Sequence, residues 1–285
     1  MTGAPPDAAR LRVVTWNIRA AIGPGEPFPP AWWRHVRRDR LERIAAILRD
    51  LDPDVATLQE VSILTPDGDV LDEPAELARM MGRNVRYAAV HAFPLVEPET
   101  GRAIGMASWG NAILSRTPMS DGFARGLPRA ADDDLIEPRG ADHPAAGIRY
   151  GDAEPGHREP RCVVGAVVGG ATVATAHLTY LGREQRRRQA AALKDVVDER
   201  PGPVILTGDF NAALTATELE PLGGLTDVFA AAGIDPDDPA RESCGRQTID
   251  HILVRGLTVE SCRVAREAGD ASDHWPVIAE LRLPG

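Results

Sequence analysis

The stretch "VILTGDFNAA" (204–213) changes from apolar to polar within three residues. Its apolar start is typical of a buried strand. On an extended chain, residues two apart project from the same face, so Asp209 and Asn211 are predicted to project together from the end of this strand. Such a pair needs partners from other parts of the chain before it can do chemistry.

Polar side chains also interrupt or end the other predicted strands. They are Asn17, Glu60, Asn111, His177, Asp209, Asn211, Asp250 and His274. Taken singly, each has an ordinary explanation, because Asn and Asp favour turns and a single His is usually structural. Taken together, they come from every part of the chain and indicate one shared site.

Glu60 follows the apolar run "VATLQ", so a carboxylate lies at the end of an otherwise apolar strand. A divalent ion with oxygen ligands could be held there, and Asn17 at the end of the first strand could share it. Because the set is rich in oxygen and contains no cysteine, it suits Mg²⁺, with Mn²⁺ as the alternative, better than zinc.

The segment "SDHWPV" places Asp273 and His274 just before the last predicted strand. The His274 imidazole could act as a general base if a carboxylate fixes its tautomer, and Asp250 of "TIDHI" is the candidate for that carboxylate. His177 supplies a second imidazole, which can take the opposite acid–base or electrostatic role. A carboxylate-held divalent ion, a base for water and neutral donors together indicate hydrolysis at phosphorus.

Two parts of the chain, each with a similar order of strands and helices, are predicted to position these side chains. A β-rich run at 11–19 precedes a Gly/Pro-rich loop, a helix at 39–50 and a strand at 55–61. A later part has a hairpin at 162–168 and 171–180 and a helix at 184–198. Further strands are predicted at 203–212, 248–254, 257–265 and 276–283. Two halves of similar order favour an α+β fold with two sheets packed face to face and helices outside.

The stretch at 119–160 is different, because it is rich in Asp, Pro, Gly and Arg and has few large apolar residues. It is predicted to be a long surface loop or an insertion over the site, without a core of its own. The strands on both sides belong to one sheet system. We therefore expect a single catalytic domain at 11–285 after a short N-terminal extension at 1–10.

The composition is that of a globular protein, with 43% hydrophobic and 26% charged residues. The formal net charge of −10 argues against a protein whose main task is to hold nucleic acid, although a local basic groove is compatible with it. Three well-separated cysteines indicate neither a disulfide framework nor a cysteine-based zinc site. No signal peptide and no apolar run of about 18 residues are found, so a cytoplasmic location is expected, with peripheral membrane contact left open.

Seven motifs occur in a fixed order: "TWNIR", "LQEV", "GNAILSR", "TAHL", "GDFNA", "TIDHILV" and "SDHWPV". They resemble the endonuclease/exonuclease/phosphatase superfamily of DNase I-like, metal-dependent phosphoesterases, over roughly residues 11 to 283. The resemblance implies a four-layer α/β/β/α sandwich with the site at one edge of the two sheets. It also implies a magnesium ion and cleavage of a phosphoester by activated water.

Carried over by position, the resemblance implies a role for each residue of the metal and base sites. Glu60 would be the principal metal ligand, with Asn17 beside it and Asp273 on the metal side. His274 would be the base and would pair with Asp250.

The remaining residues would handle the substrate. Asp209 and Asn211 would orient the nucleophile and the phosphate, and His177 would bind or protonate phosphate oxygens. The polar end of "GDFNA" would therefore lie under the phosphate that is cleaved.

Two Arg residues stand in "EPR" segments, where members of the superfamily often carry one before the strand that leads to the His. Arg161 directly precedes "CVVGAVV" and is preferred to Arg139. Together with Asn111 of "WGNAILSR", Arg161 is assigned to substrate or phosphate binding. Abasic-site enzymes usually carry Tyr in that segment, so the Asn disfavours a role in DNA repair.

The superfamily includes nucleases, deadenylases, sphingomyelinases and inositol-phosphate phosphatases, so the motifs do not choose the substrate. Because the chain is acidic overall, a small or lipid-derived phosphoester is predicted first, and DNA or RNA second. The segment at 32–40 is interpreted as a helix with a solvated Arg face, and the one at 186–189 as structural. A catalytically silent phosphate-binding relative is the third alternative, although Glu60, Asp209 and His274 are all present. No obligate protein partner is predicted.

Overall fold

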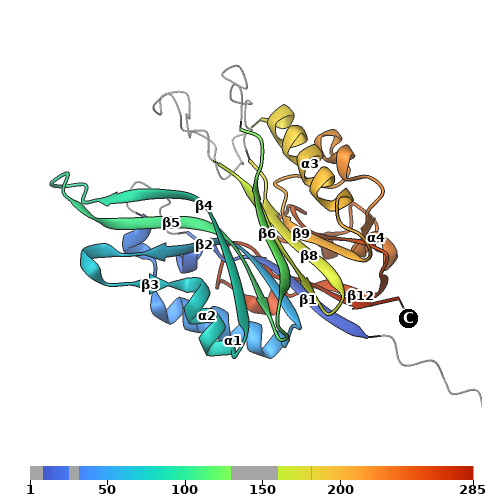
Figure 1. Cartoon of the computed structure of the whole chain (residues 1–285), viewed down its shortest axis with the longest axis horizontal. Helices are drawn as coiled ribbons and strands as arrows, with labels where there is room; N and C mark the ends of the chain where they lie inside the picture. The colour runs from blue at the N-terminus through green and yellow to red at the C-terminus, as the bar shows by residue number, and fades with distance from the viewer. Residues whose placement is uncertain (1–8, 26–31, 130–159, 181, 285) are drawn as a thin grey trace, which may run out of the picture.

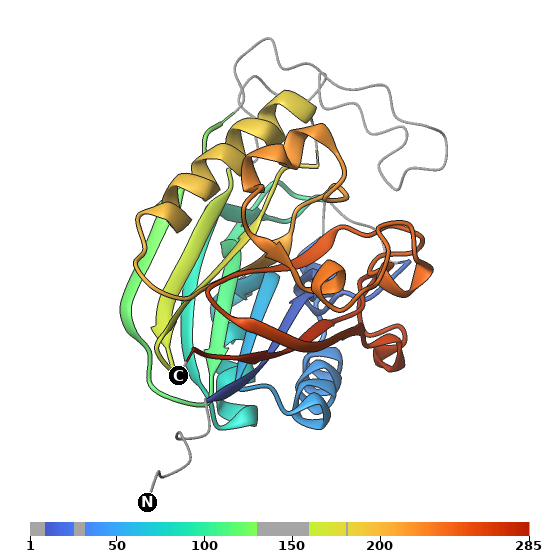
Figure 2. The same cartoon turned by 90° about the vertical axis from the view of Figure 1, so that its right-hand side faces the viewer.

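Two mixed β-sheets pack face to face, and helices cover both outer faces (Figures 1 and 2). The structure is a computed structural model that describes residues 9–25, 32–129, 160–180 and 182–284. Helices α1 and α2 lie against one sheet, and α3 lies against the other (Figure 1). This arrangement confirms the predicted four-layer α/β/β/α sandwich.

The first sheet runs in the order β12-β13-β1-β2-β5-β4, with β3 pairing to β2, and the second runs β10-β11-β9-β8-β7-β6. The strands are β1 (Arg10–Asn17), β2 (Val55–Leu64), β3 (Leu71–Asp72), β4 (Asn84–Val96), β5 (Ala103–Ser115), β6 (Ser120–Gly126), β7 (Cys162–Val168), β8 (Ala171–His177), β9 (Val204–Asp209), β10 (Thr226–Asp227), β11 (Asp250–Arg255), β12 (Thr258–Val264) and β13 (Val277–Arg282). The helices are α1 (Arg38–Leu51), α2 (Glu73–Met81), α3 (Arg183–Asp198) and the short α4 (Val228–Ala231). Within the described ranges, none of the helices has the length and apolar character needed to cross a membrane.

Each sheet contains one central parallel pair, β1 with β2 and β8 with β9. Parallel strands need a crossover connection, which α1 and α3 supply. The register places Asn17 beside Gln59 in the first sheet and His177 beside Asp209 in the second. The two strand–helix–strand units that the sequence predicts are confirmed, and the carboxyl ends of their strands lie at the edge that carries the site.

Apolar side chains fill the three spaces between the four layers. The α1 residues at helical spacing, such as Ile44 and Leu48, are fully buried against the first sheet. On β1, Val14 joins this cluster, whereas its neighbour Val13 joins the cluster between the two sheets. A third cluster connects the second sheet to α3. The central strands are apolar on both faces because each face meets a different layer.

The 119–160 stretch is only partly as predicted. Residues Ser120–Gly126 form β6, which pairs with β7 at an edge of the second sheet, so the loop prediction is wrong there. β6 is exposed along its length except at the partly buried Phe123, and such an edge strand needs few large apolar residues. Phe123 supplies its packing on Gly165, where a Cβ would overlap the Phe ring. Residues 130–159, including Arg139, and residues 1–8 of the predicted N-terminal extension lie outside the described residues.

Glu73, the first residue of α2, is a fully buried carboxyl. Its Oε2 accepts a hydrogen bond from Ser62 N at 2.6 Å, while Oε1 has no hydrogen-bond partner among the described residues. Burial raises the pKa of Glu73 to about 8 from the ordinary value of 4.5. The folded protein therefore keeps this carboxyl protonated at neutral pH, whereas the unfolded chain ionises it.

Glu73→Gln is expected to stabilise the protein more at pH 8 than at pH 5. A raised acid pKa costs folding free energy as the pH rises from the unfolded to the folded pKa, because the unfolded chain releases its proton first. Over that window the substitution removes a penalty on the order of 3 kcal/mol, or about 5 to 10 °C in Tm. Thermal unfolding of both proteins across this pH range is the measurement, and Tm curves that stay parallel would contradict the prediction.

Candidate active site

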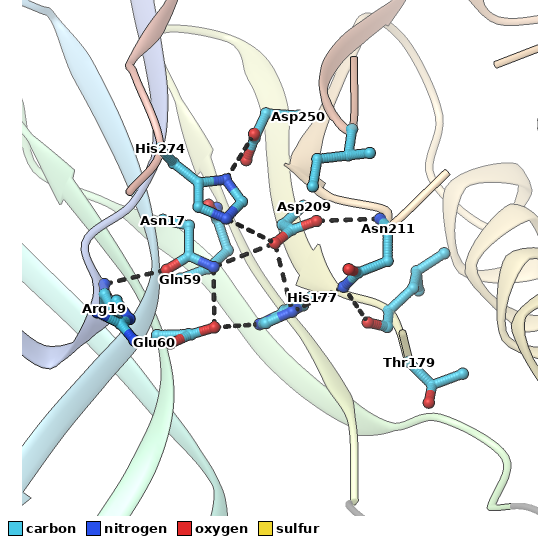
Figure 3. A network of polar contacts seen from close by, with 12 residues as sticks. Asn17, Arg19, Gln59, Glu60, His177, Thr179, Asp209, Asn211, Asp250 and His274 are labelled. Atoms are coloured by element: carbon cyan, nitrogen blue, oxygen red, sulfur yellow. Dashed lines mark hydrogen bonds and ion pairs between the residues drawn. The ribbon is translucent and has the colours of Figure 1, made fainter. Parts of the chain in front are cut away.

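Polar side chains from both sheets meet at the edge where the central strands end (Figure 3). The set comprises Asn17 at the end of β1, Glu60 in β2, His177 at the end of β8, Asp209 at the end of β9, Asp250 at the start of β11 and His274 before β13. The strand register pairs Asp209 with His177 on one side and with Asp250 on the other. Segments from the whole length of the chain therefore contribute to one buried cluster.

Asp209 lies at the centre of this network. Its Oδ2 accepts a hydrogen bond from Asn17 Nδ2 at 3.1 Å and lies 3.4 Å from His177 Nε2 and 3.8 Å from His274 Nε2. Its Oδ1 accepts a hydrogen bond from Asn211 N at 3.0 Å. Asp209 thus links a residue of the first sheet to both imidazoles (Figure 3).

His274 and Asp250 form a buried pair, with 2.8 Å between His274 Nδ1 and Asp250 Oδ2. The carboxylate is itself fixed, because Ser243 Oγ donates to the same oxygen at 2.7 Å. Burial lowers the pKa of His274, but the charge and hydrogen bond of Asp250 outweigh it and raise the pKa well above the usual 6.5. Nδ1 therefore donates to Asp250, and Nε2 is directed toward Asp209.

His177 has the opposite protonation preference. Asn211 Nδ2 lies 3.0 Å from His177 Nε2 and also donates to Leu178 O at 3.0 Å. The ring's other nitrogen, Nδ1, is 3.8 Å from Glu60 Oε1. Burial, followed by the positive charge of Arg161, lowers the pKa of His177 well below 6.5. His177 is therefore neutral under conditions where His274 is protonated, and the two imidazoles are suited to different roles.

Glu60 is held in a backbone conformation that favours glycine, with φ 54°. It lies in a bulge of β2, where the pairing with β5 shifts register between Leu58 and Val61. A bulge redirects a side chain, and a left-handed backbone costs on the order of 1 kcal/mol in a residue with a Cβ. Asn17 Nδ2 donates to Glu60 Oε1 at 3.0 Å. The strained backbone thus directs the Glu60 carboxylate to the edge of the sheets.

Asp209 and Asn211 lie together, but not for the reason that the sequence suggests. The strand ends at Asp209, and Asn211 adopts a left-handed conformation with φ 53°. The chain turns back, so that the amide N–H of Asn211 reaches Asp209 Oδ1. The prediction of proximity is confirmed, whereas the extended geometry from which it was derived is wrong for Asn211.

Two residues of the site were not singled out from the sequence. Arg19 N donates to Asn17 Oδ1 at 3.0 Å, and Arg19 Nε lies 3.4 Å from Asp273 Oδ2, which places Asp273 next to the network. The second residue is Ser243, which holds Asp250. Arg19 closes the motif "TWNIR", so its place in the motif was a signal, but Ser243 lies in a segment without any periodic pattern.

Asn111 and Arg161 lie beside the network. Asn111 Nδ2 donates to Cys162 O at 3.1 Å, so its amide holds the start of β7. Arg161 precedes this strand, is buried, and is close enough for its charge to lower the pKa of His177. The structure therefore brings Arg161 near the site, whereas the hydrogen bonds of the Asn111 side chain to described residues go to Cys162 and not to the network.

The carboxylates of the site fit a divalent cation. Burial, with the charge of Asp273, raises the pKa of Glu60 to about 7, and burial with the charge of Asp250 raises that of Asp209 to about 6. A positive charge between them would favour their ionised forms. Carboxylate and amide oxygens such as those of Glu60, Asp273 and Asn17 are the kind of hard donor that Mg²⁺ prefers, although Asn17 Oδ1 accepts from Arg19 N and Asp273 Oδ2 lies 3.4 Å from Arg19 Nε.

A second grouping has the spacing of a metal site. One potential ligand atom each from Asp209, Asp250 and His274 lies within 4.8 Å of the others. His274 Nδ1 and Asp250 are joined by a short hydrogen bond, however, and Asp250 also accepts from Ser243. A base with an orienting carboxylate accounts for this grouping without an ion, so the Glu60 end is the better candidate for a metal.

Known proteins match parts or most of this chain in sequence. The chain matches the model of the Endonuclease/Exonuclease/phosphatase family over residues 14–274. A UPF0294 protein of Vibrio cholerae serotype O1 is 33% identical over 113 residues, which are 38% of this chain and 37% of that protein, so only part of that relative's length is matched.

Solved structures share the fold. The endonuclease/exonuclease/phosphatase of Beutenbergia cavernae DSM 12333 is 25% identical, with a TM-score of 0.69 over 97% of this chain and 72% of that chain. The mannosyl-6-phosphatase Bt3783 of Bacteroides thetaiotaomicron VPI-5482 is 22% identical, with a TM-score of 0.59 over 95% of this chain and 99% of that chain.

Proposed function

The chain belongs to the Endonuclease/Exonuclease/phosphatase family, and on that premise we propose that it hydrolyses a phosphoester with water activated by His274. One observation carries the proposal. His274 Nδ1 is bonded to Asp250 at 2.8 Å, and His274 Nε2 is directed toward Asp209 at the edge that also holds Glu60. This is the arrangement of a base whose tautomer and orientation are fixed by a carboxylate.

In the proposed reaction, the oxygen of a water molecule bonds to phosphorus, and the bond from phosphorus to the leaving oxygen breaks. The proton of the water goes to His274 Nε2, and Asp250 offsets the charge that develops on the ring. Asp209 accepts a hydrogen bond from the water and orients it. Asn211 Nδ2 lies 3.0 Å from His177 Nε2 and donates to Leu178 O, so it orients the His177 ring, and the neutral imidazole is proposed to donate to a phosphate oxygen through Nδ1.

Glu60, with Asn17 and Asp273, is proposed to hold Mg²⁺, with Mn²⁺ as the alternative. When bound, the ion would offset negative charge on the phosphate oxygens. Asn17 donates to both Glu60 and Asp209, at 3.0 and 3.1 Å, so it links the metal end of the site to the end that handles water.

The substrate is proposed to be a small or lipid-derived phosphoester. The net charge of −10 supports this. So do the ion pairs that arginines of both basic segments make with carboxylates of the same chain. Arg34 donates two hydrogen bonds to the Glu99 carboxylate, each at 2.7 Å. Trp32 is buried, with its ring centroid 4.9 Å from that of Trp109, so it does not present a face on which a base could stack.

The second basic segment, at 186–189, is paired in the same way. Arg186 is buried, with Nη2 2.8 Å from Glu218 Oε1, and its Nη1 donates to Thr179 O at 3.0 Å. The ion pair joins α3 to the segment Thr217–Leu222, and the hydrogen bond to Thr179 O holds the loop that follows β8. These contacts support a structural role for Arg186 and weaken the case for nucleic acid as the substrate.

A substrate panel tests the proposal. Purified protein with Mg²⁺ would be given single-stranded and plasmid DNA, RNA, bis-p-nitrophenyl phosphate, sphingomyelin and inositol phosphates, at low and high salt. We expect hydrolysis of the small or lipid esters with little dependence on salt. Salt-sensitive cleavage of nucleic acid alone would favour a nuclease, and phosphate binding without any hydrolysis would favour the silent relative.

Asp250→Asn is expected to move the acid limb of the pH–activity profile to lower pH. The base acts in its unprotonated form, so activity rises as the pH passes through the pKa of His274, which Asp250 raises. Removing that charge lowers the pKa, while the less firmly oriented ring lowers the plateau by about 100-fold. The measurement is kcat/KM as a function of pH, and an acid limb at its original position would count against the assigned pair.

A further inference from the structure

Four strands carry the same short pattern where they approach the site: "VVTWN" in β1, "VATLQ" in β2, "VATAH" in β8 and "ILTGD" in β9. In each of them a threonine stands two residues before a polar residue at the site edge. Residues two apart on a strand share a face, so all four threonines lie directly beneath the site edge, between the sheets. We call Thr15, Thr57, Thr175 and Thr207 the threonine layer.

The strand register assembles this layer. Thr15 pairs with Thr57 in the first sheet, and Thr175 pairs with Thr207 in the second. All four side chains are fully buried, although a buried hydroxyl loses its hydrogen bonds to water. Four buried hydroxyls at one level of an otherwise apolar interface require partners.

Thr57 and Thr207 each have a backbone carbonyl of their own sheet at 3.2 Å, Val14 O and Ala174 O respectively. Closer partners lie across the interface. Thr57 Oγ1 and Thr207 Oγ1 are 2.7 Å apart, so a direct hydrogen bond joins the first sheet to the second. Gln59 is also fully buried, and its Nε2 donates to Thr15 Oγ1 at 3.0 Å and to Thr175 Oγ1 at 2.8 Å. The layer therefore makes two separate bridges between the sheets, one through a pair of hydroxyls and one through the amide of Gln59, which directly precedes Glu60.

Packing alone does not require these polar groups. One step deeper, the same four strands carry apolar residues at the corresponding positions, Val13, Val55, Val173 and Ile205. Gln59 Oε1 has no hydrogen-bond partner among the described residues, which costs stability. A valine has nearly the shape of a threonine, so an apolar layer would fill the same space.

We propose that the threonine layer and Gln59 position the two halves of the active site against each other. Asn17 and Glu60 come from the first sheet, and His177 and Asp209 come from the second, so the site exists only if the sheets keep their relative position. Apolar contact is non-directional and tolerates small sliding, whereas a hydrogen bond fixes both distance and direction. A misplacement of about 1 Å in a catalytic site can cost about 100-fold in rate.

The inference rests on the proposed function, since it concerns the same site, and it assigns positioning roles only. The test is the double variant Thr57→Val with Thr207→Val, which replaces both partners of one bridge by apolar groups of the same shape. Such a replacement can leave stability unchanged or raise it. We expect kcat to fall at least tenfold, with KM within about twofold of wild type and Tm unchanged or higher.

Three further variants sharpen this result. Thr57→Ser with Thr207→Ser keeps both hydroxyls and is expected to retain most of the activity. Gln59→Met removes the other bridge and is expected to lower kcat in the same way. Thr172→Val is the matched control, because Thr172 is also buried on β8 but belongs to the opposite face from Thr175, and it should leave kcat unchanged.

A second readout separates this inference from the proposed function. The ¹⁵N NMR signals of the His177 and His274 rings report the surroundings of both imidazoles and need no turnover. They are expected to shift in the Val double variant and in Gln59→Met. They are expected to stay unchanged in Thr172→Val. If wild type hydrolyses no substrate, the proposed function fails and the ring signals alone decide. Wild-type kcat and wild-type ring signals in both bridge variants would overturn the inference, as would a loss of kcat that only follows a loss of folded protein.

Discussion

His274→Gln is expected to lower kcat/KM for phosphoester hydrolysis by about 10³-fold while the protein stays folded. The imidazole is the group that Asp250 orients, at 2.8 Å, and whose Nε2 is directed into the site. A glutamine amide can still donate to Asp250, which avoids leaving that carboxylate buried and alone, but it cannot take a proton from water at neutral pH. The loss should therefore appear in catalysis and not in folding.

Steady-state kinetics with bis-p-nitrophenyl phosphate measure this loss, and circular dichroism reports the fold. His91→Gln is the matched control, because His91 is an exposed residue of β4 whose ring stacks on Phe93. The control should keep wild-type activity. If His274→Gln kept more than about a tenth of wild-type kcat/KM, a positioned general base would not be needed and another group would have to activate the water.

Mg²⁺ is expected to raise the Tm of the wild type, and Glu60→Gln is expected to abolish this rise and to cost about 10² to 10³-fold in kcat/KM. The amide oxygen can still accept from Asn17 Nδ2, so the network is preserved, but the charge that attracts the cation is removed. The bulge and the left-handed backbone at Glu60 direct its side chain. In Glu60→Gln the amide would be directed in the same way but would carry no negative charge.

The measurements are activity and Tm as functions of Mg²⁺ concentration. Glu220→Gln is the control, since the Glu220 side chain is 62% exposed and lies outside the network. If Glu60→Gln responded to Mg²⁺ at wild-type concentrations, the ion would be bound elsewhere, and the grouping of Asp209, Asp250 and His274 would become the candidate.

The convergence of the site residues could be predicted because apolar runs mark the ends of strands. Asn17, His177 and Asp209 each end a strand in the structure, and each follows an apolar run in the sequence. Parallel pairing within a strand–helix–strand unit then brings such ends to one edge of a sheet. The fold class follows from the same order of elements, which repeats in the two halves of the chain.

Local backbone geometry could not be predicted in this way. Glu60 and Asn211 adopt left-handed conformations, although neither is a glycine, because neighbouring strands and the network impose them. Ser243 reaches Asp250 from a segment without periodicity, and β6 is too polar to be recognised as a strand without its neighbour β7. For Glu60 and β6 the deciding contact is a neighbouring strand from elsewhere in the chain, and for Asn211 and Ser243 it is a side-chain hydrogen bond with Asp209 and Asp250. A periodic pattern of apolar residues indicates neither kind of contact.

We propose that this edge of the two sheets hydrolyses a phosphoester with water and a divalent cation. The most direct test is to strip the protein with EDTA, supply bis-p-nitrophenyl phosphate in H₂¹⁸O, and then restore Mg²⁺. The account predicts negligible hydrolysis before Mg²⁺ is restored, recovery afterwards, and the ¹⁸O label in the phosphate-containing product and not in the nitrophenol. Hydrolysis that is independent of the metal, or label in the nitrophenol, would contradict it.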